Sequence, residues 1–183
     1  METFGSFISE AKDEKYRTVI LTVEHGDKSI TAKKLSKEAT KLGLENIIVQ
    51  FNGATLKYDD GNHFIHSADD DKGFQTNSSD TIIFVRGTPS KDSHLDLISE
   101  FERLGYCVVN SRTTINICAD KYRNYVRLKD YGLTQPKTVL IPNKDMVENS
   151  FETLDTKFPI IMKTLRGSKG VGVLFIESKK SLD

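Results

Sequence analysis

A glycine-rich stretch near the end of the chain holds the residues best suited to chemistry. The sequence RGSKGVG, residues 166–172, lies between the apolar runs PIIMKTL and VLFIES. Glycines let backbone N–H groups approach an oxyanion closely and adopt dihedral angles that a side chain forbids. Ser168 adds a hydroxyl donor and Lys169 a mobile positive charge. This composition indicates that the stretch binds phosphate groups.

The order of the glycines distinguishes three kinds of phosphate-binding loop. Gly167, Gly170 and Gly172 give the order G-x-x-G-x-G, whereas the dinucleotide fingerprint is G-x-G-x-x-G at the start of a helix. The Walker loop requires Gly-Lys-Ser/Thr, also before a helix, but here a β-prone apolar run follows the glycines. A glycine-rich loop that joins two antiparallel strands and closes over nucleotide phosphates fits this order.

A lysine in the preceding apolar run favours a phosphate site over an ordinary hairpin with a polar tip, which has a similar composition. Lys163 shares one side of the predicted strand with Ile161 and Leu165, because side chains alternate along a strand. An unpaired charge on an apolar side is unfavourable, so this lysine needs an anion. A lysine fixed on a strand can hold a phosphate as a point charge.

Alternating strands and helices are predicted upstream of this loop. The helix over 29–43 has Ser29 as its N-cap and Gly43 at its end. Asp60-Gly61 suits the tight turn of a hairpin. Strand–helix–strand alternation with short links predicts a parallel sheet covered by helices. The predicted elements are strands at 17–23, 45–51, 80–87 and 106–110, helices at 29–43 and 90–105, a hairpin at 55–66 and a solvated loop at 67–80.

The remainder of the chain differs in pattern. A helical stripe predicts one helix over 112–132, a short strand follows a proline at 134–143, and a modest helix covers 144–158. The predicted domains are a polar N-terminal segment at 1–16, an α/β domain at 17–111 and a second region at 112–183.

Composition excludes several classes of protein. Lys plus Arg and Asp plus Glu both number 26 in the 183 residues, so the basic excess of a nucleic-acid binder is missing from the chain as a whole, while a local basic patch stays open. Neither a signal peptide nor an apolar run of membrane-spanning length is present, which predicts a cytoplasmic protein. Cys107 and Cys118 lie in apolar segments and are predicted to be buried thiols. His63 and His66 lie near the acidic run 69–71, but residues three apart on a strand face opposite sides, which argues against a metal site.

The stretch VVNSRTTINICADKYRNYVRLKDYGLTQPKTVLI resembles the segment that leads into the ATP-grasp domain of a ligase superfamily. A strand that ends in Asn, a helix with a DK pair and a GL-x-x-P continuation occur there in the same order. The segment DTIIFVRGTPS is similar to a segment of one branch of this superfamily, in which an arginine closes a strand of the first domain. That branch contains the ribosomal-protein glutamate ligases (RimK-type) and glutathione-synthetase-like enzymes. This resemblance implies an α/β fold in which a parallel-sheet pre-ATP-grasp domain (17–111) precedes the linker helix and glycine-flap lobe (112–183) of an incomplete ATP-grasp domain.

The resemblance also implies roles for individual residues. Lys121 and Lys163 match the two lysines that contact the phosphates of ATP, and Arg86 faces the substrate. The family's Mg²⁺ ligands are acidic residues and an asparagine far beyond the glycine flap, so they are expected beyond Asp183. The flap over the phosphates comprises Gly167, Ser168, Lys169, Gly170, Val171 and Gly172.

The implied function is an ATP-dependent carboxylate–amine ligase that forms an amide bond through an acylphosphate. Its partners would be an amino-acid donor and an amine or carboxylate acceptor, either a small molecule or a protein tail, and a homo-oligomer is compatible with it. No nucleic acid or membrane partner is predicted, and this chain alone is expected to be inactive. Two alternatives stay open: a non-catalytic α/β nucleotide-binding module and, disfavoured by the glycine order, a nicotinamide-dependent oxidoreductase.

Overall fold

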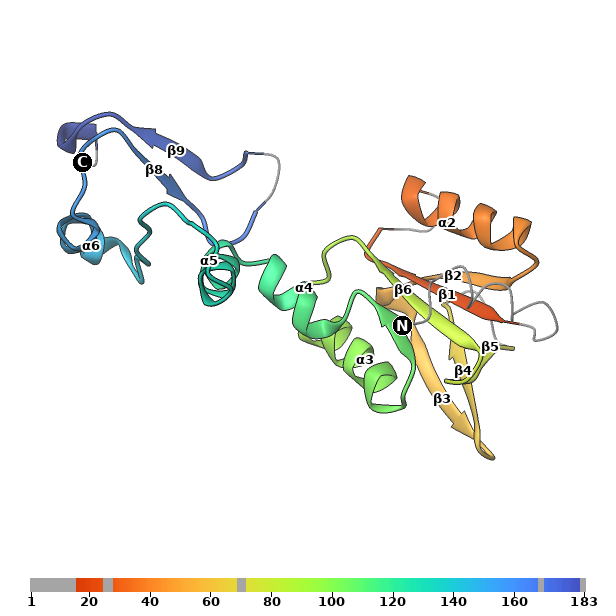
Figure 1. Cartoon of the computed structure of the whole chain (residues 1–183). Helices are drawn as coiled ribbons and strands as arrows, with labels where there is room; N and C mark the ends of the chain where they lie inside the picture. The colour runs from red at the N-terminus through yellow and green to blue at the C-terminus, as the bar shows by residue number, and fades with distance from the viewer. Residues whose placement is uncertain (1–15, 25–27, 69–71, 168–169, 182–183) are drawn as a thin grey trace. The chain divides into compact units, whose positions relative to one another are not determined.

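The chain divides into two compact units, Met1–Ile115 and Asn116–Asp183, each of which is described by itself. The predicted N-terminal segment 1–16 lies outside the described residues except for Tyr16. A computed structural model of the chain (Figure 1) describes residues 16–24, 28–68, 72–167 and 170–181.

The first unit is built on a parallel sheet, as the strand–helix alternation predicts. Its strands are arranged in the order β2-β1-β6-β7 and all neighbouring pairs are parallel. Thr22 at the end of β1 is in register with Gln50 of β2 and with Arg86 of β6. The carboxyl ends of these three strands therefore meet at one edge of the sheet. The strands are β1 (Arg17–Thr22), β2 (Glu45–Gln50), β6 (Thr81–Arg86) and β7 (Cys107–Val109).

Two helices cover opposite faces of this sheet (Figure 1). Helix α2 (Ile30–Lys41) begins at the predicted cap, where the Ser29 hydroxyl accepts a hydrogen bond of 3.4 Å from the N–H of Ala32. Gly43 follows α2 with a φ of 77°, which relieves the steric conflict that a side chain would meet there. Helix α3 (Asp92–Arg103) packs its apolar stripe on the other face.

The core lies between α3, the parallel sheet and a smaller second sheet. Strand alternation sends every second residue of β1 and β6 toward α3. The central members of this core are fully or almost fully buried: Val19, Leu21, Ile83, Val85, Leu95, Ile98 and Phe101.

The second sheet contains a strand where the sequence predicted only a loop. Strands β3 (Thr55–Asp59) and β4 (Asn62–His66) form the predicted hairpin. However, β5 (Phe74–Thr76) pairs with β4, so the solvated-loop prediction for 67–80 is wrong at these residues. The Thr76 side chain is buried and its Oγ1 lies 2.9 Å from the hydroxyl of Tyr106, so this strand is held against the core rather than in solvent.

The second unit departs from two predictions. The helix predicted over 112–132 is two helices, α4 (Arg112–Cys118) and α5 (Lys121–Asp130). The predicted strand at 134–143 is wrong, because the structure describes these residues without any strand. Pro136 and Pro142 have no N–H to donate to a sheet, which weakens that segment as a strand.

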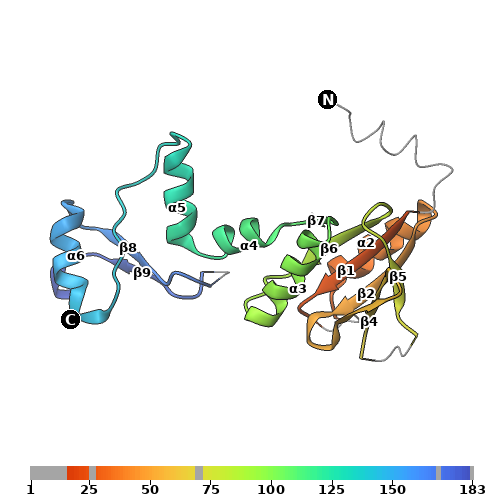
Figure 2. The ribbon, with the colours of Figure 1, turned by 90° about the horizontal axis from the view of Figure 1, so that it is seen from below.

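A hairpin dominates the rest of this unit. Strands β8 (Ile160–Lys163) and β9 (Val173–Ile176) pair antiparallel around the glycine-rich stretch. Figure 2 shows α6 (Val147–Leu154) beside this hairpin, and the turn η2 (Lys144–Met146) leads into α6. The predicted modest helix and the two strands around the glycine loop are thus confirmed.

Both cysteines were predicted to be buried, and both are exposed. Cys107 lies on the short edge strand β7, where the neighbouring Val108 packs on the core, so alternation turns Cys107 away from it. Cys118 is the last residue of α4. Within the described parts of the chain, no helix is long and apolar enough to cross a membrane.

The buried His94 of α3 predicts a loss of stability in mild acid. Its ring stacks on Phe51 at 4.8 Å, and its Nε2 lies 3.1 Å from Oδ1 of Asn52. Burial, and then the positive charge of Lys91, lower the pKa of His94. The unfolded chain therefore binds a proton below pH about 6.5 that the folded chain resists, so the free energy of unfolding falls as the pH drops below that value.

Denaturant titrations between pH 7.5 and 5 can measure this fall. A His94→Gln variant, whose amide can still bond Asn52, should lose less stability over the same range. Equal pH dependence of the two proteins would show that His94 does not cause it.

Candidate functional site

The β8–β9 hairpin exposes an apolar face that ends in a lysine. Ile161 pairs with Phe175, and Lys163 pairs with Val173, so alternation places all four side chains on one face. The apolar side chains on this face are well exposed: Ile161 over 58% of its surface, Phe175 over 62% and Val173 over 41%. Lys163 is exposed beside the glycine-rich stretch. Such a face can stack a flat apolar group and hold an anion at its end.

The connection between the two strands depends on glycine conformations. Gly167, Gly170 and Gly172 have φ angles of 136°, 80° and 70°, which L-residues rarely adopt. The N–H of Thr164 donates a 2.8 Å hydrogen bond to the Gly172 carbonyl. A Cβ at Gly172 would lie 2.4 Å from Oγ1 of Thr164. Ser168 and Lys169, predicted members of the flap, lie outside the described residues.

Lys121 is brought to the base of this connection from more than forty residues away in sequence. Its backbone N–H donates to the Leu165 carbonyl at 2.9 Å. Its Nζ donates to the carbonyls of Thr164 at 3.0 Å and Gly167 at 3.2 Å. An ammonium group has three donors, so one remains for a ligand. The structure therefore gathers Lys121 and Gly167 in one place, with Lys163 directly before Thr164 in the same hairpin.

Asp120 positions Lys121, and the prediction of site residues missed it. Its carboxylate caps α5 by accepting hydrogen bonds of 3.0 Å from the N–H groups of Tyr122 and Arg123. Only 7% of Asp120 is exposed, so the cap is fixed and Lys121 becomes the first residue of the helix. An aspartate is a preferred N-cap, so reading the DK pair as a helix start could have divided the predicted helix correctly.

Removing this cap should destabilise the second unit. In Asp120→Ala, the two capped N–H groups lose their acceptor, and we expect the free energy of unfolding to fall by about 1 kcal/mol. Asp130→Ala is a matched control, because Asp130 lies at the negative end of the same helix and its removal should be neutral or slightly stabilising. Denaturant unfolding followed by circular dichroism measures both. An equal loss in the two variants would contradict the capping role.

Arg86, the predicted substrate residue, lies in the first unit at the carboxyl edge of the parallel sheet. It is half-buried, and its Nε is buried without a hydrogen-bond partner among the described residues. Ligands of open α/β sheets bind at this edge, and an unpaired guanidinium N–H suits an anionic group.

The described residues contain no group of three or more His, Cys, Asp or Glu side chains that could hold a metal ion. Nδ1 of His63 lies 2.7 Å from the hydroxyl of Tyr106, so this histidine is hydrogen-bonded to a core residue. The acidic run 69–71 lies outside the residues that the structure describes. No metal ligand is therefore assigned here.

The second unit coincides with a known domain. The model of the RimK-like ATP-grasp domain matches residues 118–183. These residues are therefore similar to the RimK-like ATP-grasp domain. The match begins at the last residue of α4 and contains Asp120, Lys121 and the β8–β9 hairpin with its glycines.

Curated relatives of this chain carry the name probable alpha-L-glutamate ligase. The protein of Coxiella burnetii is 29% identical over 87 residues, which are 48% of this chain and 29% of the relative. That of Vibrio vulnificus is 28% identical over 87 residues, with the same coverage. The alignment thus spans less than a third of the length of these relatives.

Solved structures share the fold over most of the chain. A RimK domain ATP-grasp protein from Sphaerobacter thermophilus gives a TM-score of 0.61 at 17% identity, covering 91% of this chain and 55% of that one. D-alanine–D-alanine ligase from Helicobacter pylori gives 0.52 at 15% identity, covering 92% and 57%. The predicted α/β fold, a parallel sheet ahead of an ATP-grasp segment, is confirmed.

Proposed function

We propose that the protein is an ATP-dependent carboxylate–amine ligase of the RimK-like type. The observation that carries the proposal is the arrangement of two lysines around one glycine-rich connection. Lys163 stands at the end of an exposed apolar strand face, and Lys121 is bound to the base of the connection. The match of this segment to the RimK-like ATP-grasp domain supports the same function.

Several features of the hairpin support a nucleotide as the ligand. The face formed by Ile161, Val173 and Phe175 would stack the base, while Lys163 would bind a phosphate oxygen at its end. Backbone N–H groups of the glycine-rich connection would hold the remaining phosphate oxygens, together with Ser168, Lys169 and Val171. Lys121 would fix the base of the connection and offer its third N–H to a phosphate.

When bound, ATP would supply the phosphoryl group that converts a carboxylate into an acylphosphate with release of ADP, and an amine would then attack the acyl carbon and displace inorganic phosphate. The contribution of this chain is positioning and charge neutralisation, which dominate catalysis of phosphoryl transfer. Arg86 would bind an anionic group of a substrate through its unpaired N–H. Mg²⁺ is the expected companion of ATP, but no described residue is assigned to it, and no step is derived through it.

The proposed substrates are an amino acid and an amine or carboxylate acceptor, in a cytoplasmic reaction. The names of the relatives, glutamate ligase and D-alanine–D-alanine ligase, support amino acids as the substrate class. Single amino acids and acceptor peptides ending in a free carboxylate are therefore the first compounds to test.

The experiment is an ADP-release assay on the protein that carries this chain, with ATP, Mg²⁺, each amino acid and an acceptor peptide that ends in a free carboxylate, followed by mass spectrometry of the products. We expect ADP release that depends on an amino acid, with a product heavier than the acceptor by one amino-acid residue. ATP binding without such release or product would instead support the non-catalytic nucleotide-binding module.

A further inference from the structure

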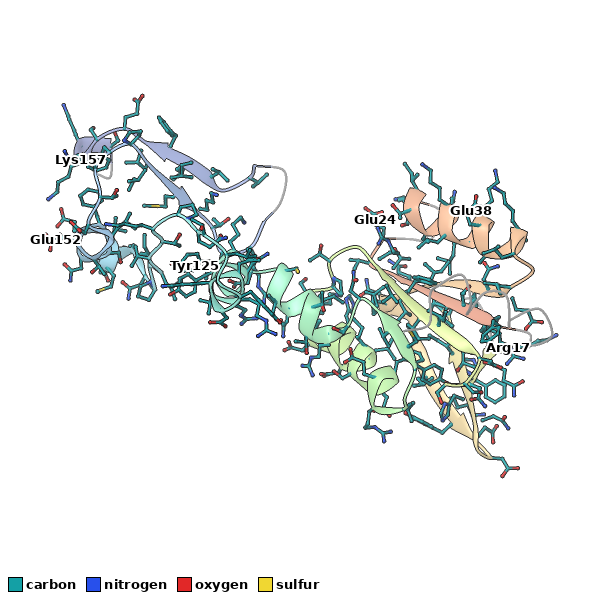
Figure 3. The ribbon with its side chains drawn as sticks, viewed as in Figure 1. Arg17, Glu24, Glu38, Tyr125, Glu152 and Lys157 are labelled. Carbon is teal, nitrogen blue, oxygen red and sulfur yellow. The ribbon has the colours of Figure 1, made fainter. Side chains whose placement is uncertain are left out.

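Helix α2 carries a lysine face that the proposed ligase chemistry does not use. Lys34, Lys37 and Lys41 follow one another at three- and four-residue steps, opposite the buried Ala32 and Ala39. Figure 3 shows Glu38 on the same helix, with its side chain among those that point away from the sheet. We call the exposed lysines Lys28, Lys33, Lys34, Lys37 and Lys41 the α2 lysine face.

These charges are little compensated within the part of the chain that the structure describes. Among the described residues, Lys41 is the one member of this face with an ion pair, to Glu38 at 2.7 Å, and the first turn of α2 holds no acidic residue. Lys33 and Lys37, like Lys37 and Lys41, are four residues apart, a spacing at which like charges destabilise a helix. Lysines near the N-terminus of a helix also oppose its dipole. The α2 lysine face therefore concentrates positive charge in a protein whose net charge is zero. This concentration lowers the stability of helix α2.

The chemistry of this face favours an acidic polypeptide as its partner. Ile30 and Leu42 frame the helix and are 71% and 63% exposed, so aliphatic contacts are available at both ends of the lysines. The helix contains neither arginine nor an aromatic residue, the side chains that stack on bases or bind phosphates in a bidentate manner. Its apolar stripe is occupied by the sheet, so it cannot insert into a lipid surface.

Spacing gives a second argument. Lysines four residues apart on a helix are separated by about 6 Å along its axis. An acidic helix with carboxylates at four-residue steps presents the same separation, so several ion pairs can form together. We propose that the α2 lysine face docks an acidic helical segment of a partner protein.

The test uses a fluorescent, alanine-based helical peptide of about 20 residues with glutamate at every fourth position. Its affinity for the chain is measured by fluorescence anisotropy at low and at moderate salt. We expect binding that weakens with salt and falls about fivefold or more in the double variant Lys34→Gln, Lys37→Gln. Glutamine retains helix propensity and removes like-charge repulsion, so the variant should melt no earlier than the parent.

The matched control is Lys129→Gln, Lys157→Gln, which lowers the net charge equally but changes the second unit, where Figure 3 labels Lys157. This variant should bind the peptide as the parent does. Three outcomes would overturn the proposal. The control variant could lose as much affinity as the double variant, or the peptide could fail to bind at low salt. A single-stranded RNA of about 20 nucleotides could also bind more tightly than the peptide. The result does not depend on ATP, so it is independent of the ligase test.

Discussion

Lys163→Ala should weaken ATP binding by about 10- to 150-fold in the protein that carries this chain. Lys163 is exposed at the end of the apolar face of the β8–β9 hairpin, where the proposed nucleotide places its phosphates. A hydrogen bond to a charged group contributes about 1.5–3 kcal/mol. Losing that free energy of binding corresponds to the expected loss of affinity. Isothermal titration calorimetry with ATP and Mg²⁺ measures it directly.

Lys157→Ala is the matched control, since this lysine is exposed in the same unit but precedes the hairpin. It should leave ATP affinity unchanged. Lys163→Arg tests the chemistry further, because a guanidinium keeps the charge but not the compact ammonium geometry. Unchanged ATP affinity in Lys163→Ala would sink the assignment of the hairpin as a nucleotide site, whatever the activity of the protein.

Local patterns predicted the first unit well because its elements are determined by neighbouring residues. The Ser29 cap, the turn at Asp60-Gly61 and the buried β1 all follow from residues within a few positions of one another. The strand β5 does not follow from residues close to it in sequence. Its pairing with β4 and the contact between Thr76 and Tyr106 are tertiary, so a polar, turn-rich stretch concealed it.

The candidate site shows the same limit. The hairpin and its glycines were predictable from periodicity and turn chemistry. The prediction that Lys163 needs an anion was not borne out, because Ile161 and Leu165 on its side of the strand are 58% and 43% exposed, so solvent can hold its charge. The proximity of Lys121 to Gly167 is a long-range contact that no local pattern contains, and only the resemblance to ATP-grasp ligases placed both at one nucleotide. Asp120 was overlooked because the helical stripe on both sides of it appeared continuous.

Gly172→Ala should damage the hairpin connection more than Gly170→Ala, and the comparison separates two physical causes. Both glycines have positive φ angles, 70° and 80°, so alanine at either position pays a backbone penalty of about 1–2 kcal/mol. Among the described residues, no atom lies within 4 Å of a Cβ at Gly170 apart from its chain neighbours, whereas a Cβ at Gly172 would lie 2.4 Å from Oγ1 and 2.6 Å from Cγ2 of Thr164. Forced contacts of this kind cost about 1–3 kcal/mol. We therefore expect ATP affinity and the free energy of unfolding to fall further in Gly172→Ala by about that amount.

A double variant identifies the contact. Thr164→Ala removes Oγ1 and Cγ2, together with the 2.8 Å hydrogen bond that the Oγ1 hydroxyl donates to the Arg166 carbonyl. Combined with Gly172→Ala, it should remove most of the extra loss relative to Gly170→Ala, because the two nearest atoms to the new methyl group are gone and the third, the Cβ of residue 164, lies at 3.1 Å. This non-additivity is the signature of two groups in direct contact. If the two single losses simply add, then Thr164 does not enforce glycine at position 172, and the positive φ angle alone accounts for the requirement.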